Sequence, residues 1–255
     1  DLLRGLPFGL HLANEVPLGD FALSGSAMAA EQTVHWGYEG DVSPAKWATL
    51  SPEFAMCGTG KNQSPIDIHG GFKSTLPKVP FSYQNGGNEI VNNGHTIQIN
   101  YAEGSQIKVD GTAFTLKQFH FHAPSENLIN GKSYPLEVHL VHMDEQKNIT
   151  VIGMMFNEGK ANPLLDLLWS QMPTKAGEKH ALDKSVNVSD LLPKDRSYYR
   201  FSGSLTTPPC SEGVRWLMLK KPMTASKAQI EQFTKLMGHP NNRPVQPMGA
   251  RFVVE

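Results

Sequence analysis

The sequence predicts a mainly β fold of the α+β class, a single domain with short helices on its surface. Several segments alternate apolar and polar residues with period two, as strands do. The 23 glycines and 18 prolines are frequent enough to end many short segments. No repeat, low-complexity tract or interdomain linker divides the 255 residues, so we expect one domain over residues 35–255.

The expected strands are short and end at turn residues. In chain order they cover residues 66–68, 90–91, 96–101, 106–109, 112–116, 118–122, 137–142, 149–156 and 214–219. Asp110 and Gly111 separate two of them, and an Asp-Gly pair is typical of a two-residue hairpin turn. A hairpin is therefore expected between residues 106 and 116.

Two segments carry helical periodicity together with capping residues. Asn162 and Pro163 open the first segment. Its apolar side consists of Leu164, Leu165, Leu168, Trp169 and Met172. The second segment begins at Ser226, has Gln229 three residues later as in a capping box, and ends at Gly238. We expect both helices to support the sheet rather than to form a functional site.

Composition limits the classes of function. The 23 basic and 24 acidic side chains nearly cancel and no basic cluster stands out, which argues against nucleic acid as a partner. No uninterrupted apolar run approaches the roughly 20 residues of a membrane span. Hydrophobic residues make up 39% of the chain, enough for a sizeable core in a soluble protein.

Residues 1–34 differ from the rest of the chain in composition, being rich in Gly, Ala, Leu and Ser. Ala27 and Ala29 resemble a signal-peptidase site, but Asp20 interrupts the apolar stretch and no Met begins the sequence. An altered signal remnant, an added leader and a genuine N-terminal extension all remain open. The poor periodicity predicts a mobile tail in each case.

The chain contains two cysteines, Cys57 and Cys210, far apart in the sequence. The residues alone leave two interpretations open: two buried free thiols or one long-range disulfide. A disulfide would indicate an oxidising compartment.

Three histidines form a candidate metal site on two predicted strands. His120 and His122 point to the same face because side chains i and i+2 do so on a strand. A second strand paired with the first could bring His139 to the same place. Three neutral nitrogen ligands with a vacant fourth position are typical of catalytic zinc. Nitrogen ligands favour zinc over magnesium or calcium, although copper and cobalt would also accept them.

Neighbouring residues support this hypothesis. Gln118 and Glu137 are in register with the histidines, so their oxygens could accept the ring N–H that does not face the metal. His142 lies on the opposite strand face from His139, which predicts a hydrogen-bonded core residue rather than a fourth ligand. Five further histidines are isolated in the sequence and are expected to be surface or structural residues: His11, His35, His69, His180 and His239.

Seven blocks of the sequence occur in an order known from one enzyme family. They are HWGY (35–38), NQSPIDI (62–68), NNGH (92–95), QFHFH (118–122), EVHLVH (137–142), SLTTPP (204–209) and NRPVQP (242–247). In these blocks the chain resembles the α-class carbonic anhydrases over essentially all of residues 35–255. The resemblance implies a catalytic domain there, with a central, largely antiparallel twisted sheet of about ten strands and a conical cleft that leads to zinc.

The resemblance also assigns site residues. It implies that His120, His122 and His139 bind zinc and that Gln118 and Glu137 orient them. Thr206 and Glu126 would together aim zinc-bound hydroxide at the substrate. The apolar pocket for carbon dioxide would be lined by Val141, Val151, Leu205, Thr207 and Trp216.

His95 stands at the position of the family's proton shuttle, and an imidazole that titrates near neutrality suits this transfer. On simple strand alternation His95 does not share a face with Thr96, Gln98 and Asn100. We expect Gly94 to turn the chain at this point.

The function that the resemblance implies is the zinc-dependent reversible hydration of carbon dioxide to bicarbonate and a proton, catalysed by a zinc lyase, with minor esterase activity. A low pKa of zinc-bound water, about 7, is a known property of this family rather than a result of this sequence. The alternative is a carbonic-anhydrase-like binding module without catalysis. The presence of all three histidines, together with Thr206 and Glu126, argues against that alternative.

The resemblance finally pairs Cys57 with Cys210, as in secreted and bacterial members, and this bond would hold the loop of Thr206. After His122, residues 123–125 replace an aromatic residue and a longer loop of the animal enzymes. This shortening resembles the bacterial branch and implies a periplasmic or secreted enzyme. Bacterial members are often homodimers, but nothing in this sequence identifies an interface.

Overall fold

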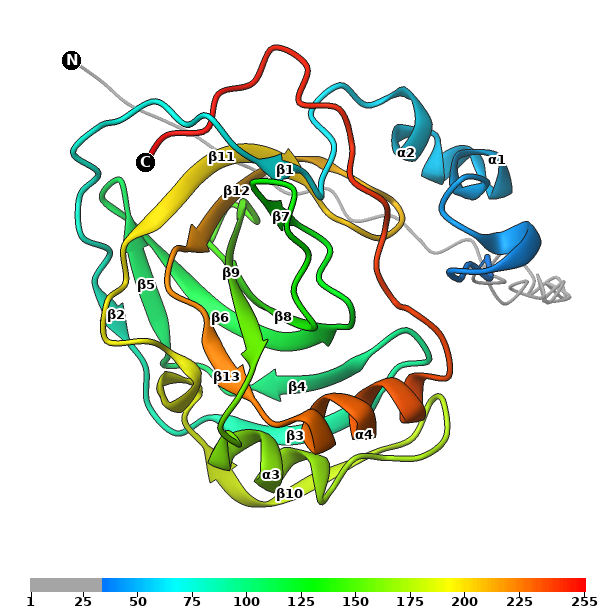
Figure 1. Cartoon of the computed structure of the whole chain (residues 1–255), viewed down its shortest axis with the longest axis vertical. Helices are drawn as coiled ribbons and strands as arrows, with labels where there is room; N and C mark the ends of the chain where they lie inside the picture. Colours follow the sequence, from blue (N-terminus) through cyan, green and yellow to red (C-terminus); the bar gives the residue numbers. More distant parts are fainter. Residues whose placement is uncertain (1–33) are drawn as a thin grey trace, which may run out of the picture. The chain divides into compact units, whose positions relative to one another are not determined.

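An 11-stranded mixed sheet forms the centre of the computed structural model, which describes residues 34–255 (Figure 1). The interpretations of residues 1–33 lie outside this range. The path of the sheet runs through β10 (Lys179–Val186), β3 (Gly87–Asn92), β4 (Ile97–Tyr101), β6 (Thr112–His122), β8 (Leu136–Met143), β9 (Ile149–Glu158), β12 (Glu212–Leu219) and β11 (Tyr198–Ser204). The mainly β prediction is confirmed.

Three short strands extend this sheet and two more form a separate pair. The extensions are β2 (Phe81–Ser82), β5 (Gln106–Val109) and β13 (Met223–Ala225), and the separate pair is β1 (Asp67–Ile68) with β7 (Leu128–Ile129). In the described part of the chain, β9 pairs in parallel with β12 and β13, β1 pairs in parallel with β7, and the other strands pair antiparallel. The sheet is thus largely antiparallel, as predicted.

The two longest helices begin where the sequence predicts, and the second one also ends there. In α3 (Pro163–Trp169) the side chain of Asn162 accepts the N–H groups of Leu164 and Leu165. In α4 (Lys227–Met237) the capping box of Ser226 is present, and Gly238 ends the helix with φ at 76°. The first helix stops before Met172, because that residue precedes Pro173 and helical conformation is disfavoured there.

The remaining helices are single turns near the start of the described chain or between late strands. They are the α-helices α1 (Trp47–Leu50) and α2 (Met56–Thr59) and the 3-10 turns η1 (Gly40–Val42), η2 (Pro52–Phe54) and η3 (Val188–Leu191). No helix in the described residues has the length and apolar character needed to cross a bilayer.

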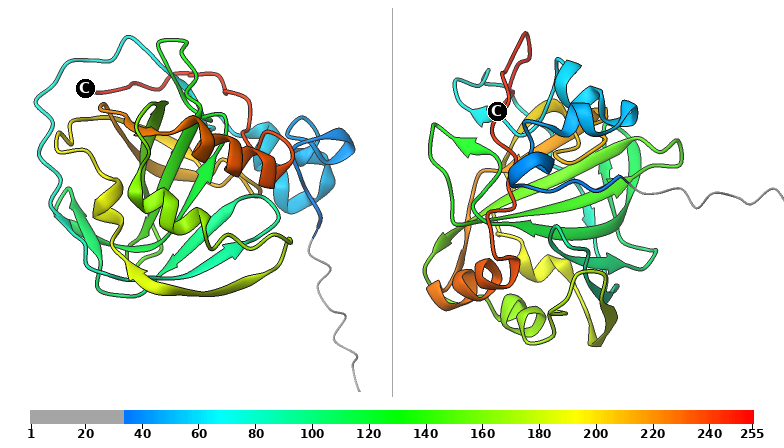
Figure 2. Two further views of the ribbon diagram at one scale, coloured as in Figure 1. Left: turned by 60° about the horizontal axis from the view of Figure 1, so that its bottom comes forward. Right: turned by 90° about the vertical axis from the view of Figure 1, so that its right-hand side faces the viewer.

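The two faces of the sheet carry different apolar clusters. One face packs Phe121 against α3 and α4, with its ring 4.8 Å from that of Trp169. Stacking of Trp169 on Phe233, at 5.5 Å between centroids, joins the two helices, which lie next to each other on the outside of the sheet (Figure 2). The other face gathers Val151 and Trp216. This second face is the one that meets the candidate site.

A β-bulge in β6 decides which residues reach each face. The strand pairs with β8 through Leu116↔His142 and then Gln118↔Val141, so Lys117 is an extra residue without a partner. Leu116 is therefore on the same side as Phe119, in the helix-covered core. The sequence predicted two strands, 112–116 and 118–122, where the structure has one bulged strand.

Candidate metal centre

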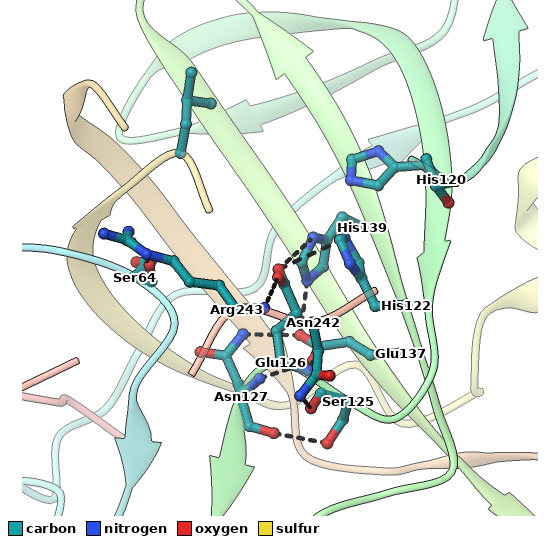
Figure 3. A network of polar contacts seen from close by, with 12 residues as sticks. Ser64, His120, His122, Ser125, Glu126, Asn127, Glu137, His139, Asn242 and Arg243 are labelled. Carbon is teal, nitrogen blue, oxygen red and sulfur yellow. Dashed lines mark hydrogen bonds and ion pairs between the residues drawn. The ribbon is translucent and has the colours of Figure 1, made fainter. Parts of the chain in front are cut away.

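Three imidazoles converge on one point between β6 and β8 (Figure 3). His120 lies directly opposite His139 in the strand pairing, and His122 follows two residues later on the same face. One ring nitrogen from each lies within 4.8 Å of the others. His122 and His139 are 1% and 2% exposed, whereas His120 is half-buried. The structure thus brings together the three residues that the sequence singled out.

Two of the imidazoles are oriented by side chains that the sequence also indicated. His120 Nδ1 lies 2.8 Å from Gln118 Oε1, and His139 Nε2 lies 2.7 Å from Glu137 Oε1. A carboxylate or amide oxygen at this distance accepts the ring proton and fixes the tautomer. The other nitrogen of each ring therefore carries a lone pair toward the common point.

The third imidazole is oriented by a residue that the sequence analysis missed. His122 Nδ1 donates to the main-chain carbonyl of Asn241, at 2.8 Å. Its Nε2 is buried and has no hydrogen-bond partner among the described residues. Buried nitrogen atoms rarely remain unpaired, and a cation held by the three rings would satisfy this one. The donor set therefore fits a metal ion that prefers nitrogen ligands, zinc foremost.

Burial keeps these rings in the form that a metal requires. It lowers the pKa of His120 well below its usual value, and the neighbouring imidazoles of His122 and His139 add to this effect. Burial likewise lowers the pKa of His139 strongly. The pKa of His122 is lowered too, although its bond to Asn241 opposes the change. All three rings are thus neutral near pH 7, as metal ligands must be.

Glu137 holds the chain beneath the site as well as His139. Its Oε2 accepts the main-chain N–H groups of Glu126 and Asn127, at 2.8 and 2.9 Å, and its Oε1 accepts the Asn127 side-chain amide at 2.8 Å. Burial raises the pKa of Glu137, and the bonds from Asn127 oppose this rise. One carboxyl group therefore links a metal-site histidine to the turn that carries Glu126 (Figure 3).

Glu126 is 1% exposed and faces the metal-site histidines. Its Oε1 accepts the main-chain N–H of Arg243 at 2.9 Å, and its Oε2 lies 3.5 Å from His122 Nε2. Burial raises the pKa of Glu126 to about 8, and the Arg243 N–H and the Thr206 side chain act against this rise. Thr206, 5% exposed, lies just after β11, close enough to Glu126 for its side chain to lower the pKa of that carboxyl.

Arg243 is a buried cation that sequence reasoning noted only as part of a family block. Its guanidinium donates to Gln63 Oε1, Ser64 O and Cys57 O, at 2.9, 2.7 and 2.9 Å. It also lies over the ring of Trp47, 5.6 Å from the centroid. Burial lowers its pKa to about 10, so it stays charged near pH 7 and joins the segment of Glu126 to the first helices.

A disulfide joins Cys57 and Cys210, which are 153 residues apart, and confirms the pairing expected from the resemblance. Cys210 N–H donates to Thr207 O at 2.8 Å. Gln63 Nε2 donates to Cys210 O at 3.0 Å. The bond therefore anchors the loop of Thr206 and Thr207 to α2.

Four of the five predicted pocket residues belong to one apolar cluster. Val151 and Trp216 are buried in it, and Val141 and Leu205 are partly buried against it. The Trp216 ring lies 4.9 Å from that of His139, in an edge-to-face arrangement. The fifth residue, Thr207, is half-buried. The conical cleft and the substrate contacts of these residues stay predictions.

His95 lies in a turn before β4 rather than in the strand, so strand alternation does not apply to it. Gly94 has φ at 85°, the left-handed region that favours glycine. Asn93 Oδ1 accepts the N–H of His95 at 2.9 Å. The imidazole stacks on Trp36, with 3.6 Å between the centroids and 6° between the planes. The turn at Gly94 is thus as expected.

Two histidines that the sequence treated as isolated lie near His95. Burial, and then the charges of His35 and His239, lower the pKa of His95. The Tyr38 ring is close to two of these rings, with its centroid 6.5 Å from that of His95 and 5.9 Å from that of His239. His35 is exposed and His239 is partly exposed, as expected for surface residues, although the fold brings both near His95 from segments that are distant in the sequence.

The other histidines are less connected to the site. His142 is fully buried, lies 2.6 Å from the Tyr83 hydroxyl, and has its pKa lowered by burial to about 3. It is thus the core residue that was predicted. His69 and His180 are exposed at the surface, and His11 lies outside the described residues.

The mainly β fold and the three nitrogen donors indicate a protein with a catalytic metal site. Three imidazole ligands, with the fourth position left to water or substrate, characterise catalytic rather than structural metal sites. A family model described as eukaryotic-type carbonic anhydrase matches residues 42–255.

Known relatives agree over most of the chain. A carbonic anhydrase of Pectobacterium carotovorum is 50% identical over 226 residues, which are 89% of this chain and 93% of the relative. A carbonic anhydrase of Neisseria gonorrhoeae is 50% identical over 231 residues, 90% of this chain and 91% of the relative.

A solved structure of a hyperthermostable carbonic anhydrase from an active hydrothermal vent chimney is also similar, with a TM-score of 0.85 and 54% identity over 87% of this chain and 99% of that chain. The α-carbonic anhydrase of Thermovibrio ammonificans in complex with sulfanilamide gives a TM-score of 0.86 and 52% identity, over 88% of this chain and 100% of that chain. The chain therefore belongs to the eukaryotic-type, or α-class, carbonic anhydrase family, and is a carbonic anhydrase.

Proposed function

We propose that the protein catalyses the reversible hydration of carbon dioxide with a zinc ion held by His120, His122 and His139. The observation that carries this proposal is the convergence of three neutral imidazole nitrogens within 4.8 Å, one of which is buried without a hydrogen-bond partner in residues 34–255. When bound, zinc supplies Lewis acidity that makes a water molecule nucleophilic near neutral pH, a known property of this family.

Thr206 and Glu126 would orient the nucleophile. Arg243 N–H occupies Glu126 Oε1, which leaves Oε2 to accept the hydroxyl proton of Thr206. The charge of a bound zinc ion would favour the ionised form of Glu126. A threonine hydroxyl that donates to this carboxylate can only accept from the attacking oxygen. The lone pair of that oxygen is then directed at the substrate carbon, so the pair contributes through positioning.

The apolar cluster beside the histidines would receive carbon dioxide. The substrate is linear and apolar, so side chains such as Val141 and Leu205 can accommodate it without hydrogen bonds. Thr207 and Trp216 would complete the wall, and Val151 supports it from the next strand. The small pocket favours carbon dioxide over bulky esters, and minor hydrolysis of small activated esters by the same nucleophile is part of the proposal.

His95 would accept the proton released in each turnover and pass it to buffer. Replacement by alanine is expected to lower kcat in weak buffer by about tenfold, because water and dilute buffer substitute only in part for a positioned base. Small imidazole buffers should restore the rate. Stopped-flow measurement across buffer concentrations tests this, with the exposed His180→Ala as control. Unchanged turnover in weak buffer would assign the proton to another group.

Removal of the metal is the direct test of the proposed activity. We expect zinc-loaded protein to hydrate carbon dioxide, a chelator to abolish the activity, and added zinc to restore it. A folded, zinc-loaded protein without hydration activity would refute the proposal and favour a binding module.

The disulfide supports a periplasmic or secreted location, since such bonds persist in oxidising compartments. We also propose a homodimer, which is the assembly that the family resemblance implies for bacterial members. Sedimentation analysis of the purified protein would distinguish it from a monomer.

A further inference from the structure

Asn241 lies between the metal-site strand and the turn of His95. The residue is fully buried. Its main-chain carbonyl accepts from His122 Nδ1, and its side-chain oxygen accepts the N–H of Ala123 at 2.8 Å. Its own N–H donates to Ala123 O at 3.3 Å. Three of its bonds therefore fix it to the end of β6, immediately after the second histidine of the site.

The side-chain amide of Asn241 makes the connection to His95. Its nitrogen donates to the main-chain carbonyl of His95 at 3.0 Å and to that of Phe121 at 2.9 Å. Both amide hydrogens are thus used, one on each segment. At this position only an amide offers two donors and one acceptor; a carboxylate would offer no donor.

The other bonds of the turn are of a different kind. Asn93 accepts the N–H groups of His95 and Thr96, and Asn92 accepts that of Gly94, so both act within the turn itself. Thr96 Oγ1 donates to Phe121 O at 2.5 Å and holds the start of β4. Within the part of the chain that the structure describes, hydrogen bonds of Asn241 connect the main chain of His95 to the segment of a metal-site histidine.

We infer that Asn241 is a positioning residue for proton transfer, which sets the place of His95 relative to the metal-site histidines. The inference rests on the proposed function, because it takes His95 as the proton acceptor. Proton transfer depends steeply on the separation of donor and acceptor, and a misplacement of about 1 Å can cost up to roughly 10²-fold in rate. The main-chain carbonyl of Asn241 orients the His122 ring of the metal site. The side-chain amide holds the main chain of His95.

The first test uses zinc-loaded Asn241→Ala, which retains the main-chain carbonyl that orients His122. We expect full zinc content, kcat in weak buffer lowered by about tenfold and kcat/KM within about twofold of the parent, because the proton leaves after the reaction with carbon dioxide. Imidazole buffer should restore kcat. Asn241→Asp keeps the size and the acceptor oxygen but lacks both donors. It should likewise lower kcat in weak buffer and leave kcat/KM nearly unchanged.

The second test does not depend on activity. The stack on Trp36 at 3.6 Å places the His95 ring in the ring-current field of the indole. In zinc-loaded protein with labelled histidine, NMR resonances of His95 should move toward those of an unstacked imidazole in Asn241→Ala. If the parent enzyme hydrated no carbon dioxide, the proposed function would be refuted. The NMR spectra would still show whether Asn241 determines the position of His95.

Asn162→Ala is the matched control. Asn162 is also buried, at 5% exposure, and its side chain accepts two main-chain N–H groups, but at the start of α3. It should leave kcat in weak buffer and the His95 resonances unchanged. Any of three results would overturn the inference. The first is an equal loss of kcat in Asn162→Ala, and the second is unchanged turnover and spectra in Asn241→Ala. The third is a loss of both zinc and kcat/KM in Asn241→Ala.

Discussion

Replacement of His139 by alanine is expected to strip zinc from the purified protein and to reduce carbon dioxide hydration to the background rate. The variant loses one of three nitrogen ligands and leaves the Glu137 carboxyl, 0% exposed, without the ring that it orients. Loss of a group that merely orients a ligand already costs about 10–100-fold in metal affinity, so loss of the ligand itself should cost more. Elemental analysis and stopped-flow hydration measure the two effects.

His180→Ala is the control for His139→Ala. It removes an exposed imidazole from β10 and should keep both zinc and activity. Stoichiometric zinc with full hydration activity in His139→Ala would show that the metal does not bind between β6 and β8.

Thr206→Val is expected to retain zinc and to lose about 10²-fold or more in kcat/KM, the effect of removing one preorganised hydrogen-bonding group from a transition state. Valine keeps the shape of threonine but cannot donate to Glu126 or accept from the nucleophile. The variant also removes the Thr206 side chain that lowers the pKa of the Glu126 carboxyl, so this pKa should rise further. Hydration kinetics at several pH values, with zinc content measured in parallel, separate orientation from metal loss.

Thr150→Val is the matched control for Thr206→Val. It also replaces a threonine hydroxyl by a methyl group, but on the other face of the sheet. Thr150 pairs with His142 in the strand register, so both face the helix-covered core. Its hydroxyl is buried without a hydrogen-bond partner among the described residues, and its removal should leave folding and activity intact. If Thr206→Val stayed within about threefold of the parent in kcat/KM, orientation through Thr206 and Glu126 would be excluded.

The sequence could place the histidines because the pattern that carries them is local. Period-two alternation puts Gln118, His120 and His122 on one face, and Glu137 with His139 on another strand. The same pattern cannot find Asn241 or Arg243. Their bonds reach 119 residues back to His122 and 186 residues back to Cys57, and only the folded chain brings such segments together.

The same distinction applies to the fold. The two long helices were predicted correctly since Asn162 and Ser226 mark them by capping within a few residues. β10 was not predicted, because only Leu182 and Val186 are buried along it. Its residues therefore lack the period-two alternation of apolar and polar side chains that identifies a strand. β2 was missed because it is two residues long and is held by its pairing with β5.

The bulge at Lys117 has a consequence for insertions and deletions. The hairpin before it, built on β5 and the first part of β6, can gain or lose residues in pairs at its tip without altering the register of the histidines. Between Lys117 and His122 a change of one residue would exchange the two faces, so that Phe119 and Phe121 would occupy the places of the imidazoles. This stretch of β6 therefore has a fixed length wherever the fold keeps its three histidines.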